Sequence, residues 1–337
     1  MTLVRTLLPI CLSALAGLLA APAVQAQEVW LAPQASVPPS PLHRAVDFMD
    51  LFRPDAPWRA TAARVKVFKL YASFLGPASQ DQVNAIVADL NRRHIAIALE
   101  AGVIDVGPIS THPPCGGLGL VEGYGVPEQA RAIADKIKRA GGVVRYIAMD
   151  EPLWYGHFFT GKPGGQPGCH SSVGEIARLV VPTLSAYVDA FPTVAIGDVE
   201  PSDVADQPGW RAVMADWGRA YQAAMGRPLA FFHLDIPWAR PDAQKTALDL
   251  FAFAESLKRQ GMVEKVGVIY DASPMAPGDA AWVREAQSHI RFLEMDNGLR
   301  PDHAVFQSWT ASPTHALPET APDTLTGLAN AYIQAHP

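Results

Sequence analysis

Acidic side chains recur where apolar segments of this sequence end. They are Glu100, Asp150, Glu151, Asp198, Glu200, Asp235 and Asp271. If several of these ends converge, burial and mutual repulsion raise the pKa of some carboxyl groups and leave others ionised. A protonated acid beside an ionised one is the pair that general acid/base catalysis uses. A lone carboxylate at such an end could instead cap the next helix, and Asp198 and Asp271 are the candidates for that role.

The segment Arg145–Tyr155 holds two of these carboxylates side by side. An apolar run typical of a buried strand ends in Asp150 and Glu151, and Pro152 then stops the strand. Barrel enzymes with parallel strands keep their chemistry at this end of a strand. The elements around the segment therefore decide whether the other carboxylates join it.

Aromatic residues accompany the acids. Trp154 and Tyr155 follow Glu151, whereas Trp238, Tyr270 and Trp309 lie near the ends of later apolar runs. We expect Trp154, Trp238 and Trp309 to line a cleft and Tyr270 to pack in the core. Carboxylates walled by indole rings suit a carbohydrate, because sugar hydroxyls donate to acids and sugar C–H faces stack on rings.

Strand and helix patterns alternate regularly along the chain. Strands are predicted at Val29–Ala32, Val65–Tyr71, Ile95–Glu100, Val143–Glu151, Thr193–Glu200, Leu229–Asp235, Val266–Asp271 and Ala304–Trp309. Helices are predicted at Gln80–Arg92, Pro127–Arg139, Val173–Ala190, Gly209–Met225, Ala243–Lys258, Asp279–Asn297 and Asp323–Ala335. This order predicts an α/β single domain, a (β/α)8 TIM barrel. Without the isolated first strand, an open doubly wound sheet is the competing fold.

The loops that follow strands are much longer than the loops that precede them. The long ones are Val103–Val126, Pro152–Ser172 and Thr310–Pro322. Cys115 and Cys169 lie in the loops after the third and fourth strands, so a disulfide across the rim of the barrel is expected. Lys69 and Arg145 lie inside strand patterns, where a charge needs a partner, and an acid of the mouth or lumen is the expected one.

The tripeptide Asp150-Glu151-Pro152 resembles the strand-four motif Asn-Glu-Pro of barrel glycoside hydrolases in the clan of cellulases and β-glycosidases. The resemblance implies that Glu151 is the general acid/base and that a second carboxylate ending strand seven is the nucleophile. Asp150 replaces the Asn of the motif, and Asp271 stands where the family has Glu.

The adjacent Asp-Glu pair is also similar to hexosaminidase-type barrels. There the Glu protonates the leaving oxygen, and the Asp orients the substrate's own 2-acetamido group. Alternation along a strand sends Asp150 and Glu151 to opposite faces unless a bulge intervenes. The alternation therefore favours a single catalytic Glu151 with Asp150 in a supporting position.

Three carboxylates are candidates for the partner of Glu151: Asp271 by strand position, then Glu200, then Asp235. Substrate-binding roles are expected for Glu100, Asp150, Trp154, Asp198, His233, Asp235, Trp238 and Trp309. His233 and Asp235 share a strand face and could form a hydrogen-bonded pair. A core position is the alternative for His233.

The first 26 residues predict an exported protein. Met1–Ala26 has the charged start, apolar middle and small-residue end of a signal peptide, which predicts a periplasmic or extracellular location. Residues 27–44 form a Pro-rich segment with the first strand, and residues 45–337 form the rest of the barrel. The formal net charge of −6 and the lack of basic tracts argue against a nucleic-acid partner, and no later stretch suits membrane insertion.

The sequence therefore predicts a secreted glycoside hydrolase, a monomer that needs no cofactor or metal. Two alternatives stay open. One is a metal-dependent barrel hydrolase or isomerase that holds a divalent cation with strand-end acids. The other is a non-catalytic carbohydrate-binding barrel.

Overall fold

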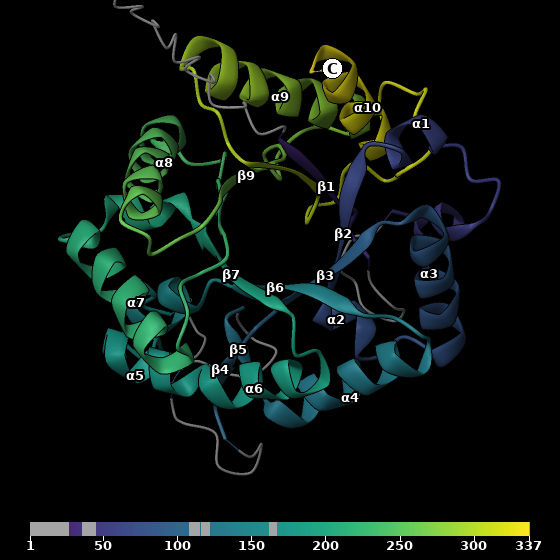
Figure 1. Ribbon diagram of the computed structural model, residues 1–337. Helices are drawn as coiled ribbons and strands as arrows, with labels where there is room; N and C mark the ends of the chain where they lie inside the picture. The colour runs from purple at the N-terminus through teal and green to yellow at the C-terminus, as the bar shows by residue number, and fades with distance from the viewer. Residues whose placement is uncertain (1–26, 36–44, 108–114, 116–121, 162–166, 337) are drawn as a thin grey trace, which may run out of the picture.

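The computed structural model describes residues 27–35, 45–107, 115, 122–161 and 167–336 (Figure 1). The predicted signal peptide and most of the Pro-rich segment after the first strand lie outside the described residues.

Eight parallel strands close into a barrel in the order β1-β10-β9-β8-β7-β6-β3-β2 (Figure 1). They are β1 (Glu28–Ala32), β2 (Val65–Tyr71), β3 (Ala96–Ala101), β6 (Val144–Asp150), β7 (Ala195–Pro201), β8 (Phe232–Asp235), β9 (Val266–Tyr270) and β10 (His303–Gln307). The predicted TIM barrel is confirmed. The first strand completes the ring by pairing with both β2 and β10, which rules out the open sheet.

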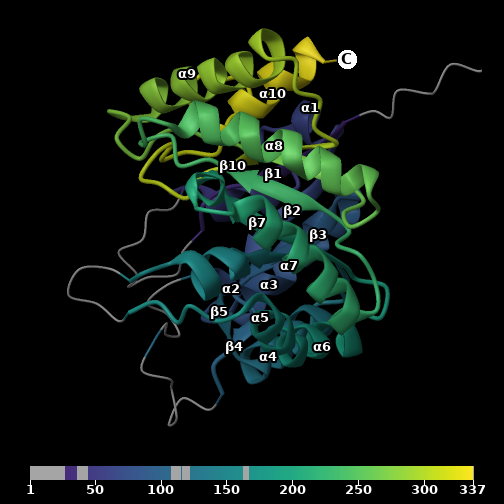
Figure 2. The ribbon, with the colours of Figure 1, turned by 90° about the vertical axis from the view of Figure 1, so that its left-hand side faces the viewer.

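Helices surround the barrel, and Figure 2 shows α5, α7 and α8 along one side of it. The main helices are α3 (Gln80–Arg93), α4 (Pro127–Arg139), α5 (Val173–Leu179), α6 (Val181–Ala190), α7 (Trp210–Met225), α8 (Ala243–Arg259), α9 (Asp279–Ile290) and α10 (Leu325–Ala335). Short helices are α1 (Arg59–Ala62) and α2 (Ala72–Leu75), and a small sheet pairs β4 (Ile104–Asp105) with β5 (Tyr124–Gly125). The helix expected at 173–190 is divided into α5 and α6, where Pro182 opens the second helix.

Side chains of alternate strand residues fill the lumen. One apolar cluster inside the barrel contains Trp30, Val67, Ala98, Ala148, Val199, Phe231, Ile269 and Val305. The residues between them face the helices and form the larger core. The lumen is therefore packed, and polar groups collect beyond this cluster at the carboxyl ends of the strands.

The opposite end of the barrel holds a cavity of about 540 Å³, lined by Glu28, Lys66, Arg145 and Tyr146 among others. Arg145 is exposed there, near the amino end of β6. The prediction that an acid of the mouth or lumen pairs with Arg145 is wrong, because its strand position faces solvent.

Candidate active site

Alternation on six strands directs polar side chains inward at the carboxyl end of the barrel. Each of these residues lies two or four positions along its strand from a residue of the apolar cluster in the lumen. Because side chains alternate along a strand, each therefore points to the same side, into the barrel. They are Lys69 and Tyr71 on β2, Glu100 on β3, Asp150 on β6, Asp235 on β8, Asp271 after β9 and Gln307 on β10. We call this group the mouth cluster.

Lys69 is the cation of the mouth cluster. Its side chain is fully buried and forms an ion pair with Glu100, as the sequence predicted for a charge inside a strand. A buried ion pair of this kind is retained only where further polar groups surround it. The ammonium also opposes the rise in the pKa values of Asp150 and Asp235, so its charge acts on these two acids as well as on Glu100.

Glu151 adopts a backbone conformation that is rare outside glycine. Its φ is 51°, in the left-handed region, directly after the last residue of β6. The Glu151 N–H donates to the carbonyl of Val199 at 3.0 Å, and its carbonyl accepts from the N–H of Tyr155 at 3.0 Å. Strained backbone of this type costs roughly 1–3 kcal/mol and persists only where surrounding bonds fix it.

Charge interactions connect Glu151 to the mouth cluster despite strand alternation. Burial raises its pKa well above the usual range, and the carboxylates of Glu122, Asp235, Asp150 and Glu200 raise it further. The left-handed turn ends the strand geometry on which the opposite-face expectation depended. Glu151 is therefore close enough to Asp150 and Asp235 for all three to influence one another.

Asp150 and Asp235 behave in the same way. Burial and the charges of Glu100 and Glu122 raise the pKa of Asp150. Burial and the charge of Glu100 raise the pKa of Asp235 to about 7. An acid such as Asp235, with a pKa near neutrality, can exchange protons at physiological pH, as general acid/base groups must.

Glu200 has its oxygens occupied by backbone. Oε1 accepts from the N–H of Leu153 at 2.6 Å and Oε2 from the N–H of Trp154 at 2.9 Å. The residue is fully buried and faces the helices, because the neighbouring Val199 faces the lumen. Burial and Asp198 raise its pKa, and the two N–H groups oppose that rise. Glu200 thus fixes the turn that follows Glu151.

Asp271 is positioned by indole groups. The Trp309 indole N–H donates to Oδ2 at 2.9 Å, and Trp309 itself is 41% exposed, as a cleft residue would be. Burial and Asp235 raise the pKa of Asp271, whereas the Trp309 and Trp238 indoles lower it. Trp238 stacks on His289 with ring centroids 3.6 Å apart. Oδ1 of Asp271 and the Trp238 indole nitrogen are both buried, and neither makes a hydrogen bond of good geometry among the described residues.

Two predicted binding residues lie away from the cleft. Asp198 faces α7 and accepts from the Trp217 indole N–H at 2.6 Å, so its side chain points away from the mouth cluster and does not cap a helix. Burial raises its pKa to about 8. His233 does face the lumen, but it lies below the mouth, packed against Trp30 and Phe231.

His233 has a different partner from the one predicted. Its Nε2 lies 2.9 Å from Nδ1 of His303, and its Nδ1 has no partner among the described residues, so the predicted pair with Asp235 is wrong. The two residues share a face as expected, but they sit at different depths. Burial lowers the pKa of both histidines, to about 4 for His303. The core alternative for His233 is correct.

Tyr270 and Trp154 also belong to the packing around the barrel. Tyr270 is buried, as predicted, and donates to Glu294. Trp154 packs against the core between barrel and helices, and its ring lies 6.3 Å from that of Phe158. Trp309 is thus exposed, whereas Trp154 packs against the core, and a substrate-binding role for either stays a prediction.

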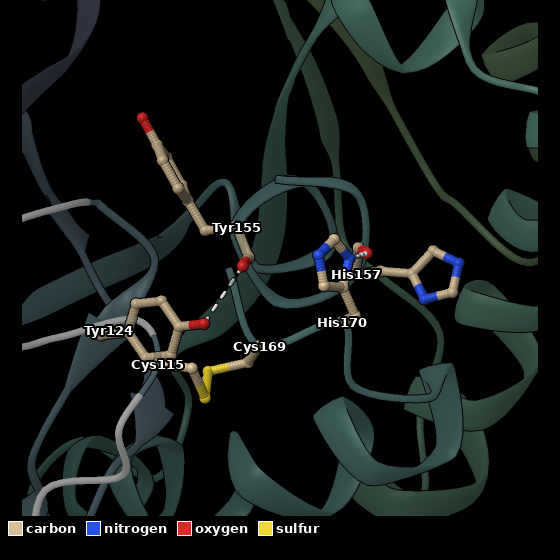
Figure 3. Close-up of a disulfide and its surroundings, with 6 residues drawn as sticks. All are labelled: Cys115, Tyr124, Tyr155, His157, Cys169 and His170. Carbon is tan, nitrogen blue, oxygen red and sulfur yellow. Dashed lines mark hydrogen bonds between the residues drawn. A yellow bond between two sulfur atoms is a disulfide. The ribbon is translucent and has the colours of Figure 1, made fainter. Parts of the chain in front are cut away.

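The predicted disulfide is present. Cys115 and Cys169 are bonded with their Cα atoms 4.9 Å apart (Figure 3). Beside the bond, the Tyr124 hydroxyl donates to the backbone carbonyl of Tyr155 at 3.1 Å, as the dashed line in Figure 3 shows. The bond therefore joins the loop after β3 to the loop that follows Glu151.

Three site residues were not identified from the sequence: Tyr71, Glu122 and Gln307. Tyr71 and Gln307 end strands, and strict alternation could have found them. Glu122 lies in a long loop without periodicity, where it accepts from the Tyr155 hydroxyl at 3.0 Å. No signal in the sequence pointed to it.

Within the described ranges, no three His, Cys, Asp or Glu side chains converge as ligands for a metal ion. None of the helices in this part of the chain is long and apolar enough to cross a membrane.

No protein-family model matches the sequence, and no curated protein matches it. Similar solved structures exist. One is a GH5_18 protein from Streptomyces cattleya in complex with GlcNAc, with a TM-score of 0.51, 12% identity, and coverage of 92% of this chain and 80% of that one. Another is a psychrophilic glycoside hydrolase family 10 endo-β-1,4-xylanase, with a TM-score of 0.50, 10% identity, and coverage of 90% and 96%. At these identities the likeness shows the fold alone, a TIM barrel of the kind found in glycoside hydrolases.

Proposed function

We propose that this protein is a glycoside hydrolase in which Glu151 is the general acid. The observation that carries the proposal is the position of Glu151. It is a buried carboxyl group, held in a strained turn at the mouth of the barrel, and neighbouring carboxylates keep its pKa high. A carboxylic acid whose pKa is raised keeps its proton to higher pH and can donate it to the leaving oxygen of a glycosidic bond.

Asp235 is the best second carboxylate. It faces the lumen, its charge raises the pKa of Glu151, and its own pKa is raised to about 7. Glu200 is less suited, because backbone N–H groups occupy both of its oxygens. Asp271 is held by Trp309 at the other side of the mouth, where it can bind substrate.

In this mechanism Glu151 protonates the glycosidic oxygen as the bond to the sugar carbon breaks. Asp235 stabilises the positive charge that develops on the sugar, either as nucleophile or as the base that activates water. Trp309, exposed beside Asp271, offers a ring face for the sugar. Both solved structures named above carry a glycoside hydrolase family name, which supports a carbohydrate substrate. The signal-peptide pattern of residues 1–26 supports export.

The test is a screen of the purified mature protein against a panel of poly- and oligosaccharides, with released reducing ends as the readout. Glu151→Gln keeps the shape of the side chain and removes the acid, so it should reduce kcat by about 10²-fold or more. Asp235→Asn should do the same. Asp216→Asn, in an exposed ion pair on α7, is the matched control and should leave the rate unchanged.

Hydrolysis that survives Glu151→Gln would refute the assignment of the acid. Sugar binding without any hydrolysis by the wild-type protein would instead support a non-catalytic barrel. Loss of activity with a chelator would support the metal-dependent alternative.

A further inference from the structure

We propose that the sugar bound at the mouth carries a free amino group, and that its ammonium sits between Asp271 and Gln307. This inference rests on the proposed function and names the substrate class of the same site. Three independent observations support it: the charge balance of the mouth, the unpartnered atoms on β9 and β10, and the indole groups beside them.

The mouth has far more negative than positive groups. Six carboxylates perturb one another's pKa or that of Tyr71: Glu100, Glu122, Asp150, Glu151, Asp235 and Asp271. Lys69 is the cation that acts on them, and Glu100 already occupies its ammonium. A cleft lined by one sign of charge concentrates ligands of the opposite sign. A neutral sugar would add no counter-charge for those of these carboxyl groups that are ionised.

Gln307 provides an observation that does not depend on the acids. Its side chain is 2% exposed, it faces the lumen two residues beyond Val305, and its Oε1 has no hydrogen-bond partner among the described residues. A buried polar atom left without a partner costs about 1–3 kcal/mol unless a ligand or water satisfies it.

Asp271 presents a second such atom beside the first. Phe306 pairs with Tyr270 in the register of β10 and β9, so Gln307 and Asp271 follow on adjacent strands. The Trp309 indole donates to Oδ2 of Asp271, which is only 1% exposed, whereas Oδ1 makes no hydrogen bond of good geometry. The Trp238 indole N–H, which also lacks a well-aligned partner, lies near enough to lower the pKa of Asp271 and is the protein donor that a ligand would compete with. Once ionised, this carboxylate accepts but cannot donate, so the ligand group that stabilises its ionised form is a donor.

An ammonium group fits better than a hydroxyl. It supplies three donors in place of one, and it neutralises a charge that burial makes costly. The Trp309 and Trp238 rings lie at the same carboxylate and can add cation–π attraction. An amino sugar joins this cation to the ring hydroxyls and C–H faces that the rest of the cleft would bind.

Binding should also release a proton. Burial and Asp235 raise the pKa of Asp271, and a bound ammonium would lower it again. Besides Asp235, the charged groups near Asp271 are Glu285 and His289 on α9; the His289 Nδ1 lies 2.9 Å from the Asp271 carbonyl. Proton release on binding is thus a readout that a purely structural role for Asp271 would not produce.

The experiment compares three tetrasaccharides with the same β-1,4-gluco backbone that differ only at C2: glucosamine, N-acetylglucosamine and glucose units. Calorimetry on the full mature chain carrying Glu151→Gln measures Kd without turnover. We expect the glucosamine tetramer to bind at least about tenfold more tightly than the other two. Titrations in buffers of different ionisation enthalpy should show proton release for that ligand alone.

Asp271→Asn in the Glu151→Gln background should raise the Kd of the glucosamine tetramer by about ten- to hundredfold. The Kd values of the other two tetramers should change by less than about twofold. Asp216→Asn is the control. Gln307→Ala provides a second variant if Asp271→Asn does not fold, with the same direction of change. Galactosamine oligomers are measured in parallel. Selective binding of these oligomers would support the inference and show that the site prefers the C4 epimer of glucosamine.

Equal affinity for the three tetramers, a glucosamine preference that survives both variants, or failure of both amine series to bind would overturn the inference. Its failure can be told apart from failure of the proposed function. Hydrolysis of a neutral glycan that depends on Glu151 would keep the function and remove the amine preference. Amine-selective binding without hydrolysis of any glycan by the wild-type protein would support the amine preference and refute the proposed hydrolase function.

Discussion

Replacing Glu200 with Gln should separate the positioning of Glu151 from direct catalysis. Glu200 accepts hydrogen bonds from the Leu153 and Trp154 N–H groups with no solvent exposure. An amide can accept only one of them and turns its own donor toward the other. The loss of one hydrogen bond to a charged group is worth about 1.5–3 kcal/mol.

That loss is similar in size to the strain it offsets. The left-handed backbone of Glu151, with φ of 51°, costs roughly 1–3 kcal/mol. Without its second bond the turn should populate relaxed conformations, and about 1.4 kcal/mol is enough to lower the competent fraction tenfold. We therefore expect Glu200→Gln to lower kcat by about tenfold or more, with a smaller change in KM.

Asp198→Asn is the matched control, because Asp198 is also a buried carboxylate on the outer side of β7 and binds Trp217 instead of the turn. Both variants should lower the free energy of unfolding, and only Glu200→Gln should lower kcat. Steady-state kinetics on the best glycan and chemical denaturation measure the two effects. Equal destabilisation with kcat unchanged in both variants would refute the positioning role. A complete loss of turnover at unchanged stability would give Glu200 a direct part in the chemistry.

Three further predictions follow from the same structure. The pKa of Asp235 is about 7, so kcat/KM should rise as pH increases through that value, because Asp235 ionises, and should fall at higher pH, where Glu151 loses its proton. A pH profile of kcat/KM measures this, and an acidic limb centred below pH 5 would contradict the role of Asp235 as the base. Replacing both disulfide cysteines by Ser should reduce the free energy of unfolding by about 4 kcal/mol, because the bond spans 54 residues, and denaturant titration of the variant measures this. Gly267→Ala would place a Cβ 2.6 Å from the buried histidine pair and should cost about 1–3 kcal/mol, whereas Gly218→Ala, where the nearest atom is 3.4 Å away, should not destabilise the protein.

The barrel could be predicted because each of its strands is buried on both faces and reads as an apolar run between helical patterns. The same property hid which acids face inward. In β7, Asp198 and Glu200 share one face and Val199 lies on the other, but the sequence does not tell which face is the lumen. In the structure Val199 faces the lumen, so both acids face the helices. Depth was hidden too, since His233 and Asp235 share a face but only the latter reaches the mouth.

Glu151 shows the limit of periodicity most directly. Alternation sends it away from Asp150, but the left-handed backbone of Glu151 ends the strand geometry on which that expectation depends. Left-handed backbone at a non-glycine residue depends on tertiary bonds, here from Val199, Tyr155 and the carboxylate of Glu200. Local sequence contains no sign of those partners.

The pairing of β1 with β10 has a consequence for how the chain folds. Glu28 pairs with His303, so the ring cannot close until nearly the whole chain is available. Contacts between such distant residues form slowly, because the entropy of a very long loop must be lost first. Until then the carboxylates of the mouth stay hydrated in an open sheet, and closure removes much of that water in one late step. Mildly acidic solution, which neutralises some of these acids beforehand, should therefore speed the last step of folding.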